Sequence, residues 1–239
     1  MNCIVCDESM DLIKTDVHKC TECNHIFIDY KDNGLDYHKN EYRKNGQGNR
    51  TNSNIEIVNG VFTNEFHKVR DRIMSKRVKL VKKYTNVNLD SSILDIGAGG
   101  GTFAKKMKSD LGIQIEVQEI SDICINNLIM MKFNVHKGDF SEIKFDKQYD
   151  LVTCWHALEH IKDLHSYAEN LSEVTKDICI LEVPINRSLK EPNNGNWDGH
   201  YHFFTEKSMT KLFGKYFSSL EFSTTESVQQ PALLTILKK

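Results

Sequence analysis

The residue types best suited to chemistry in this chain gather where one short apolar run ends. The run Ile93–Ile96 contains Asp95 and leads into a turn at 97–101 that is almost entirely glycine. Glycine lets a backbone turn approach a ligand closely, and a helix expected from Thr102 offers free N–H groups in its first turn. A buried strand, a glycine turn and a helix in this order predict a site for a cofactor that contains a nucleoside.

A carboxylate follows at the spacing typical of the second strand in a nucleotide-binding fold. The run 113–119 ends in Glu119, eighteen residues after Gly101. In such folds an acid at this position accepts hydrogen bonds from ribose hydroxyls. The alternative is a glycine-rich turn that binds no ligand, and Glu119 makes that alternative the weaker one.

The order of the glycines narrows the choice of cofactor. A dinucleotide fingerprint reads G-x-G-x-x-G and faces a pyrophosphate. This chain instead reads Asp95-x-Gly97-x-Gly99-x-Gly101. A carboxylate at the strand end repels phosphate but attracts an ammonium group. S-adenosylmethionine carries an ammonium and a sulfonium and has no phosphate. The segment resembles motif I of the class I S-adenosylmethionine-dependent methyltransferases.

The resemblance implies how the cofactor is held. Asp95 and Gly97 would contact its methionine part, and Glu119 its ribose. Asp139 resembles the acid that accepts a hydrogen bond from the adenine amino group, and Phe140 would pack on the adenine ring, although a Gly-Asp pair also makes a good turn. The implied cofactor-binding residues are Asp95, Gly97, Ala98, Gly99, Gly101, Glu119, Ile120, Asp139, Phe140 and Trp155.

Two histidines follow the expected fourth strand, 149–155. The segment contains His156 and Leu158-Glu159-His160 and resembles the "LEH" segment of a large methyltransferase group that includes many sugar and quinone methylating enzymes. An imidazole titrates near neutrality, so His156 or His160 could remove the proton of an oxygen nucleophile. Alternatively, a histidine at a helix start hydrogen-bonds backbone, and positioning dominates methyl transfer.

A second histidine pair follows the expected fifth strand, 177–183. His200 and His202 stand next to Phe203 and Phe204, in a pattern similar to segments that border the acceptor site of methyltransferases acting on nucleotide-linked sugars. Either histidine could deprotonate an acceptor. Metal binding by this pair has no nearby Cys or Glu pattern in its favour. In the alternative interpretation, the two phenylalanines anchor the loop and Thr205 caps the next helix.

The cysteines predict a metal site at the N-terminus. Cys3-x-x-Cys6 and Cys20-x-x-Cys23 supply four thiolates, the set that a structural zinc ion prefers, with His18 and His25 as possible substitutes. A closed shell of four thiolates leaves no position for a substrate, so we expect a structural role. The other three cysteines are expected to be core residues.

Strands and helices alternate from residue 92 onward, and two β-like runs near the C-terminus favour a closing antiparallel pair. The predicted fold class is α/β: a Rossmann-like, seven-stranded, mostly parallel sheet with helices on both faces, plus a small N-terminal four-cysteine zinc ribbon. The predicted division is a zinc ribbon at 1–30, a linker or substrate lid at 31–60, and a class I methyltransferase domain at 61–239.

Composition restricts the partners. The 239 residues have 39% hydrophobic and 27% charged residues and a formal net charge of −2, so no overall basic excess attracts nucleic acid. One basic stretch, 68–83, is the exception. No run has the length of a membrane span, and the first residues lack the layout of a signal peptide, so we expect a cytoplasmic protein. The sequence does not indicate an oligomeric state.

The sequence therefore predicts an enzyme that moves a methyl group from S-adenosylmethionine to a small polar acceptor. The acceptor would be an oxygen of a nucleotide-activated sugar or another nucleotide-linked precursor of capsule polysaccharide or surface glycan. One alternative is an RNA methyltransferase that grips RNA with the ribbon and the basic helix. Another is a cofactor-binding protein without catalysis.

Overall fold

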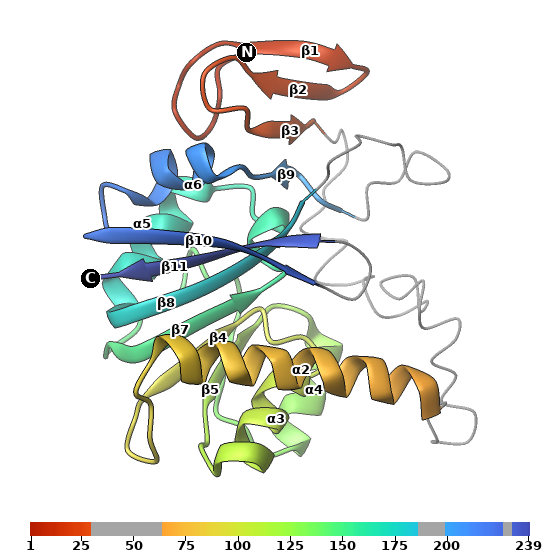
Figure 1. The fold of residues 1–239 in the computed structure, drawn as a ribbon, viewed down its shortest axis with the longest axis vertical. Coiled ribbons are helices and arrows are strands. Elements are labelled where there is room, and N and C mark those ends of the chain that lie inside the picture. Colours follow the sequence, from red (N-terminus) through yellow and green to blue (C-terminus); the bar gives the residue numbers. More distant parts are fainter. Residues whose placement is uncertain (30–63, 186–198, 227–230) are drawn as a thin grey trace.

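The computed structural model describes residues 1–29, 64–185, 199–226 and 231–239. The segment 31–60, predicted to be a linker or a lid, lies outside the described residues, as does the last residue of the predicted 1–30 unit. Within the described part, the chain forms one large sheet with helices and a small N-terminal unit (Figure 1).

The large sheet has seven strands in the order β10-β11-β8-β7-β4-β5-β6. Strands β4 to β8 pair in parallel, and β11 runs antiparallel to both β8 and β10. The predicted fold class is confirmed, including the closing antiparallel pair. The strands are β4 (Ile93–Ile96), β5 (Glu116–Glu119), β6 (Val135–Lys137), β7 (Tyr149–Trp155), β8 (Thr175–Pro184), β10 (Ser219–Glu226) and β11 (Pro231–Lys238).

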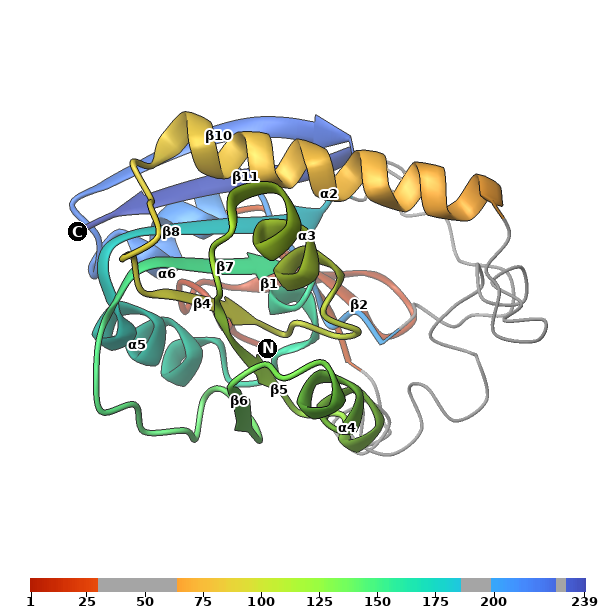
Figure 2. The same ribbon diagram turned by 90° about the horizontal axis from the view of Figure 1, so that it is seen from below.

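Helices cover both faces of this sheet because its inner strands are apolar on both sides. In β4, Ile93 packs into the core on one face and Leu94 and Ile96 into the core on the other. The first face is covered by α2 (Asn64–Tyr84), α3 (Thr102–Leu111) and α4 (Asp122–Met130) (Figures 1 and 2). The second face is covered by α5 (Leu164–Val174) and α6 (Glu206–Phe213).

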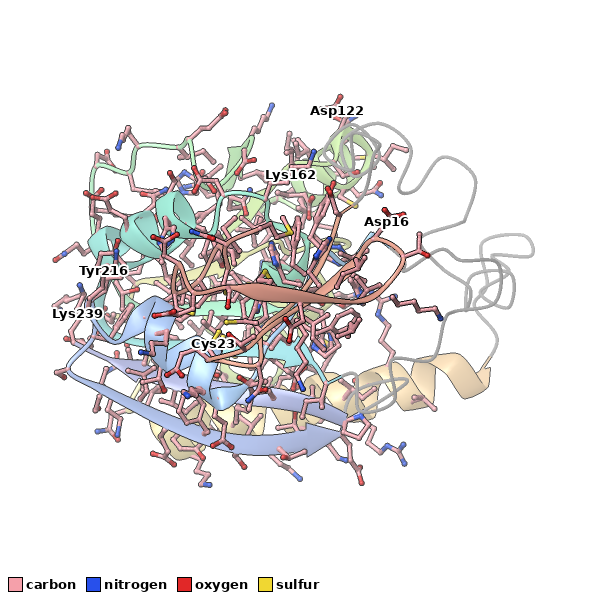
Figure 3. All side chains as sticks on the ribbon, turned by 90° about the horizontal axis from the view of Figure 1, so that it is seen from above. Asp16, Cys23, Asp122, Lys162, Tyr216 and Lys239 are labelled. Carbon is pink, nitrogen blue, oxygen red and sulfur yellow. The ribbon has the colours of Figure 1, made fainter. Side chains whose placement is uncertain are left out.

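The N-terminal unit is built from β1 (Met10–Lys14), β2 (Val17–Cys20) and β3 (Ile26–Ile28). A strand from a distant part of the chain, β9 (His202–Phe203), completes its sheet by pairing with β3. In Figure 3, which is seen from above, this unit lies in front, between the labelled Cys23 and Asp16. Its cysteines also belong to the apolar cluster that holds Phe204, so the unit and the larger domain share one core.

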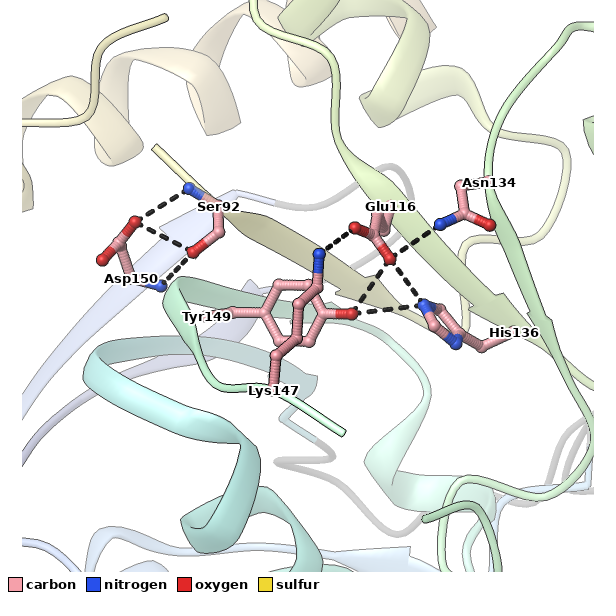
Figure 4. A network of polar contacts seen from close by, with 7 residues as sticks. All are labelled: Ser92, Glu116, Asn134, His136, Lys147, Tyr149 and Asp150. Atoms are coloured by element: carbon pink, nitrogen blue, oxygen red, sulfur yellow. Dashed lines mark hydrogen bonds and ion pairs between the residues drawn. The ribbon is translucent and has the colours of Figure 1, made fainter. Parts of the chain in front are cut away.

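A polar network fastens the starts of the parallel strands, at the edge opposite the glycine turn (Figure 4). Glu116 of β5 accepts hydrogen bonds from His136 Nε2 at 2.7 Å, Tyr149 Oη at 3.0 Å and Asn134 Nδ2 at 2.9 Å, and it pairs with Lys147. Nearby, the Asp150 carboxylate accepts from the backbone and the hydroxyl of Ser92. These bonds connect β4, β5, β6 and β7 without involving the glycine turn.

We expect Glu116→Gln to lower the free energy of unfolding by about 1–3 kcal/mol, because partly buried donors lose their charged acceptor. Burial raises the pKa of Glu116, but hydrogen bonds from Lys147, His136 and Tyr149 outweigh it and hold the pKa below its ordinary value. A carboxyl group with a lowered pKa stabilises the folded protein at pH values above its pKa in the unfolded chain, about 4.3. This stabilisation is lost as the pH falls through the pKa of the group in the folded protein.

Urea unfolding at pH 7 and at pH 3.5 would measure this difference. The loss of unfolding free energy in the Glu116 variant, relative to the wild type, should reach its full size at pH 7 and be smaller at pH 3.5. Glu169→Gln, on the exposed side of α5, is the matched control and should change stability by less than about 0.5 kcal/mol. Equal stability of the Glu116 variant and the wild type at pH 7 would contradict the role given to this network.

Candidate cofactor and acceptor site

The glycine turn lies at the carboxyl end of β4, in contact with the segment that follows β7. Gly97, Gly99 and Gly101 all adopt positive φ, at 65°, 55° and 69°. A Cβ on Gly97 would stand 2.5 Å from the Cβ of Ala157. The turn and the histidine segment are thus packed so closely that a side chain at position 97 has no room. This is the cradle expected for a ligand that needs direct backbone approach.

The residue before Glu119 braces this turn. Gln118 Oε1 accepts a hydrogen bond from the Gly97 N–H at 3.0 Å, and its Nε2 donates to the Gly138 carbonyl at 2.6 Å. Gln118 is buried and connects the first and third strand ends of the site. The sequence did not indicate this role for Gln118, because the polar residues that alternate along 113–119 could equally well face solvent.

Glu119, which the sequence predicts to bind the ribose, lies beside the glycine turn. Its Oε2 accepts from the Gly99 N–H at 2.6 Å, and its Oε1 accepts from the N–H groups of Ile120 and Ser121, each at 2.9 Å. A carboxylate has about four lone-pair positions, so it can accept one more hydrogen bond. Ile120 and Ala98, both predicted to bind the cofactor, contact this strand end through their backbones. The Ala98 N–H donates to the Gln118 carbonyl at 3.0 Å.

Asp139 and Phe140 occupy the turn after β6. Asp139 Oδ1 accepts from the Ser141 N–H at 2.9 Å, which is the hydrogen bond of a turn. The Phe140 ring is buried and packs against Tyr167, with centroids 4.9 Å apart, and against Phe145. The structure thus gives Phe140 a core position, while its backbone stays in the turn.

Asp95 and Trp155 lie at the ends of neighbouring strands. The buried Asp95 carboxyl accepts a hydrogen bond from Thr153 Oγ1 at 2.7 Å. Burial raises the pKa of Asp95 to about 7, and the Thr153 hydrogen bond and the charge of Arg77 oppose the rise. The Trp155 ring has the Arg77 guanidinium 4.8 Å from its centroid and the Phe103 ring at 5.0 Å. An ammonium group near Asp95 would favour its ionised form.

His156 lies between two buried carboxylates. Its Nδ1 is 3.4 Å from Glu159 Oε1, and its Nε2 is 3.3 Å from Glu182 Oε1. Burial lowers the pKa of His156, but the two carboxylates outweigh it and raise the pKa to about 9. Its φ of 57° is rare for a residue with a side chain. The backbone is held there by the hydrogen bond from the His156 N–H to the Glu182 carbonyl at 2.8 Å.

Glu182, which the sequence did not single out as a site residue, anchors this group. Arg77 of α2 donates to its Oε1 from Nε at 3.1 Å and from a terminal nitrogen at 2.5 Å, and Thr225 Oγ1 donates to Oε2 at 2.8 Å. Burial raises the pKa of Glu182, but Arg77 and His156 lower it to about 2. The basic helix therefore directs one of its charges into the protein.

His160 and His200 contact each other beside Glu159. The His160 Nδ1–H donates to the Gly199 carbonyl at 2.9 Å, and the two imidazole rings stand edge to face with centroids 4.7 Å apart. The Nε2 atoms of both histidines lie 4.0 Å from Glu159 Oε1. Three of the four predicted histidines, His156, His160 and His200, thus gather around one carboxylate.

His202 lies apart from this group, inside the core between the N-terminal unit and the site. Its Nε2–H donates to the Ile161 carbonyl at 2.8 Å, and its Nδ1 accepts from His25 Nε2–H at 3.0 Å. Burial lowers the pKa of His202 to about 3. Because both nitrogens are used within the core, we infer that His202 positions the loop rather than activating an acceptor, which revises its predicted catalytic role.

The four N-terminal cysteines form a compact cluster. Their sulfur atoms all lie within 4.8 Å of one another, with Cys3–Cys23 at 3.8 Å and Cys6 at 3.5 Å from both Cys20 and Cys23. Zn–S bonds of about 2.3 Å in a tetrahedron place sulfurs about 3.8 Å apart, so the cluster fits a zinc ion. The chain has no disulfide, since all seven cysteines are free thiols.

The fold and the glycine turn define a class I methyltransferase, and comparisons with known proteins agree. The family described as "Methyltransferase domain" matches residues 66–216. The chain belongs to this family and is an S-adenosylmethionine-dependent methyltransferase.

Curated relatives match at lower identity. The ubiquinone biosynthesis O-methyltransferase of Rickettsia bellii (strain OSU 85-389) is 27% identical over 132 residues, which are 52% of this chain and 54% of the relative. The enzyme of the same name from Glaesserella parasuis serovar 5 is 25% identical over 126 residues, or 48% of this chain and 53% of the relative. The chain thus spans about half the length of the curated relatives it matches.

Solved structures share the fold. Magnesium protoporphyrin IX methyltransferase from Synechocystis PCC 6803, with bound S-adenosylmethionine, superposes with a TM-score of 0.63 at 12% identity, covering 88% of this chain and 100% of that one. The methyltransferase domain of bacterial CtHen1 gives a TM-score of 0.57 at 16% identity, covering 72% of this chain and 100% of that one.

Within the described residues, no helix is long and apolar enough to cross a membrane.

Proposed function

We propose that this methyltransferase acts on a hydroxyl oxygen of a small polar molecule, with a nucleotide-activated sugar as the first candidate and another nucleotide-linked precursor of capsule polysaccharide as the second. One observation carries the proposal: Gly97 of the cofactor turn packs against Ala157, directly beside His156 and close to the Glu159 group. A methyl donor in the turn would therefore lie near a group of imidazoles and carboxylates, which suits a polar acceptor.

The cofactor role is proposed for the residues at the strand ends. Asp95 and the glycine turn would hold the methionine part, Glu119 the ribose, and Asp139 the adenine. Glu119 fits because the Gly99 N–H already orients its carboxylate. When bound, S-adenosylmethionine supplies a methyl group on a positively charged sulfur. The chain's own residues place the acceptor oxygen in line with that methyl group.

The acceptor role is proposed for the histidines around Glu159. His156, His160 and His200 all lie within 4.0 Å of the same carboxylate oxygen, Oε1. This places three polar rings next to the turn and provides hydrogen-bonding groups that orient a hydroxyl. Trp155 contributes to the wall of the site, held between Phe103 and Arg77.

We further propose that Cys3, Cys6, Cys20 and Cys23 hold a structural zinc ion. The thiols fit its ligand set and spacing. The ion would stabilise the N-terminal unit, to which the loop carrying His200 is joined through the pairing of β3 with β9. Its effect on catalysis would therefore be indirect, through the position of that loop.

A second candidate is favoured by the relatives, whose names specify ubiquinone biosynthesis and O-methylation. A phenolic hydroxyl of a quinone precursor is also a small-molecule oxygen acceptor and would use the same site. RNA is less favoured because the net charge of −2 gives no overall attraction to it and because Arg77 of the basic helix is bound to the buried Glu182.

Initial rates with defined acceptors test the proposal. Purified protein and S-adenosylmethionine would be supplied with nucleotide sugars, with a catechol such as 3,4-dihydroxybenzoate, or with transfer RNA. We expect turnover with a nucleotide sugar. Turnover confined to the catechol would replace the sugar by the second candidate, and turnover of RNA that falls steeply with salt would contradict both small-molecule proposals.

A further inference from the structure

Glu159 is a buried carboxylate whose nearest cationic side chain, His156, also faces Glu182. Its side chain is fully buried, and among the described residues neither oxygen has a hydrogen-bond partner. A buried carboxylate that accepts no hydrogen bond and shares its cation with a second acid is costly in free energy, so a further cation bound to it would be favourable. Glu159 stands next to the cofactor turn, at the point where acceptor residues gather.

Three imidazole nitrogens surround one oxygen of this carboxylate at distances too long for good hydrogen bonds. They lie 3.4 Å (His156), 4.0 Å (His160) and 4.0 Å (His200) from Glu159 Oε1, whereas N–H···O bonds are about 2.7–3.2 Å long. His156 also faces Glu182, so its charge is shared between two acids. The side chains converge on a common point without closing on one another.

The tautomer of His160 makes this arrangement distinctive. Because the Gly199 carbonyl can only accept, His160 Nδ1 carries the hydrogen, and in the neutral ring the lone pair is on Nε2. That Nε2 is the atom turned toward Glu159. In this neutral form the lone pair and the carboxylate face each other and repel, and a cation between them, either a proton or a metal ion, would remove the repulsion. A backbone carbonyl that fixes the outer nitrogen of a histidine is also the usual support of a metal ligand.

The donors are held in place by backbone bonds. The Tyr201 N–H donates to the Glu159 carbonyl at 2.9 Å, which joins the His200 loop to the short helix η2 (Leu158–His160). One donor atom from each of Glu159, His160 and His200 lies within 4.8 Å of the others. Donors on one cation, at about 2.0–2.2 Å each, are about 3–4.3 Å apart, so small side-chain rotations would complete the site.

We propose that Glu159, His160 and His200 bind a divalent first-row metal ion on the acceptor side of the cofactor turn. Two imidazoles and one carboxylate suit Mn²⁺, Fe²⁺ or Zn²⁺ better than the all-oxygen preference of Ca²⁺. Three protein ligands leave positions open, and there the ion would hold the acceptor hydroxyl. Binding of the ion stands on the geometry alone, whereas this orienting role rests on the proposed function.

The test uses the full chain with its cysteine cluster loaded with zinc, titrated with Mn²⁺ alone and followed by electron paramagnetic resonance. Mn²⁺ is the weakest competitor of the series and does not displace zinc from thiolates. We expect about one bound Mn²⁺ per chain. Glu159→Gln and His200→Ala should each weaken binding at least tenfold. Glu173→Gln, an exposed carboxylate on α5, is the matched control and should bind as the wild type does.

Thermal melting and S-adenosylmethionine binding would be measured for both variants to establish that they are folded. Absence of stoichiometric Mn²⁺ binding to the wild type would overturn the proposal, and so would unchanged binding in both folded variants. The second result would leave Glu159 and the histidines as a charge network only. Because the titration contains no acceptor, its outcome is independent of whether the proposed acceptor is correct.

Discussion

Replacing Cys20 and Cys23 by serine is expected to reduce kcat/KM for methyl transfer by about 100-fold or more, although no cysteine of the cluster is proposed to touch a substrate. Loss of a structural zinc ion removes most of the folding free energy of a small metal-bound unit. Thr205 Oγ1 donates to the Cys23 carbonyl at 2.7 Å, and β3 pairs with β9. A loosened N-terminal unit would therefore release the loop that carries His200, and displacement of such a group by about 1 Å costs about 100-fold in rate.

The same variant should keep its affinity for S-adenosylmethionine within about threefold, because the glycine turn follows β4 of the seven-stranded sheet, whereas the cysteines belong to the N-terminal unit with its own sheet. Zinc content, calorimetric cofactor binding and initial rates measure the three effects together. Ser9→Ala changes an exposed residue of the same unit outside the cluster and is the control. A double variant that loses zinc but transfers methyl groups at the wild-type rate would contradict the coupling of this unit to the site.

Gly97→Ala is expected to weaken S-adenosylmethionine binding by at least tenfold and to destabilise the protein. A non-glycine residue at a φ of 65° costs of order 1–3 kcal/mol, and the new Cβ would stand 2.5 Å from the Ala157 Cβ. Relief of that clash requires the turn to move away from the histidine segment. Both the cofactor backbone contacts and the approach to the acceptor residues are then lost.

Gly100→Ala is the matched control for stability, because a Cβ there meets no atom within 4 Å. Its melting temperature should stay close to that of the wild type, whereas that of Gly97→Ala should fall by several degrees. Calorimetry with S-adenosylmethionine and thermal melting test both statements. Wild-type cofactor affinity in Gly97→Ala would show that the turn does not require glycine at this position.

Local patterns predicted much of the fold. The alternation of strands and helices and the C-terminal antiparallel pair both depend on neighbouring residues, and the structure has both. Contacts between distant segments could not be read this way, and the pairing of β9 with β3 joins residues about 175 positions apart.

In the candidate site, too, features set by neighbouring residues could be predicted and contacts between distant segments could not. The position of Glu119 beside the glycine turn could be predicted, because one helix and one short strand fix its spacing from the glycines. Gln118 and Glu182 escaped notice because a polar residue in a strand gives no sign of whether it faces solvent or a partner such as Arg77. The group around Glu159 was visible only in part, since His200 reaches it through the fold.

The most direct test of the account is the fate of the methyl group. Purified zinc-loaded protein would be incubated with methyl-labelled S-adenosylmethionine and a cell extract, which is then separated into small molecules, RNA and protein. We predict label in the small-molecule fraction, on a compound whose mass increases by one CH2 unit, and much less label with Gly97→Ala. Label recovered only in RNA or in protein would contradict the proposed acceptor class.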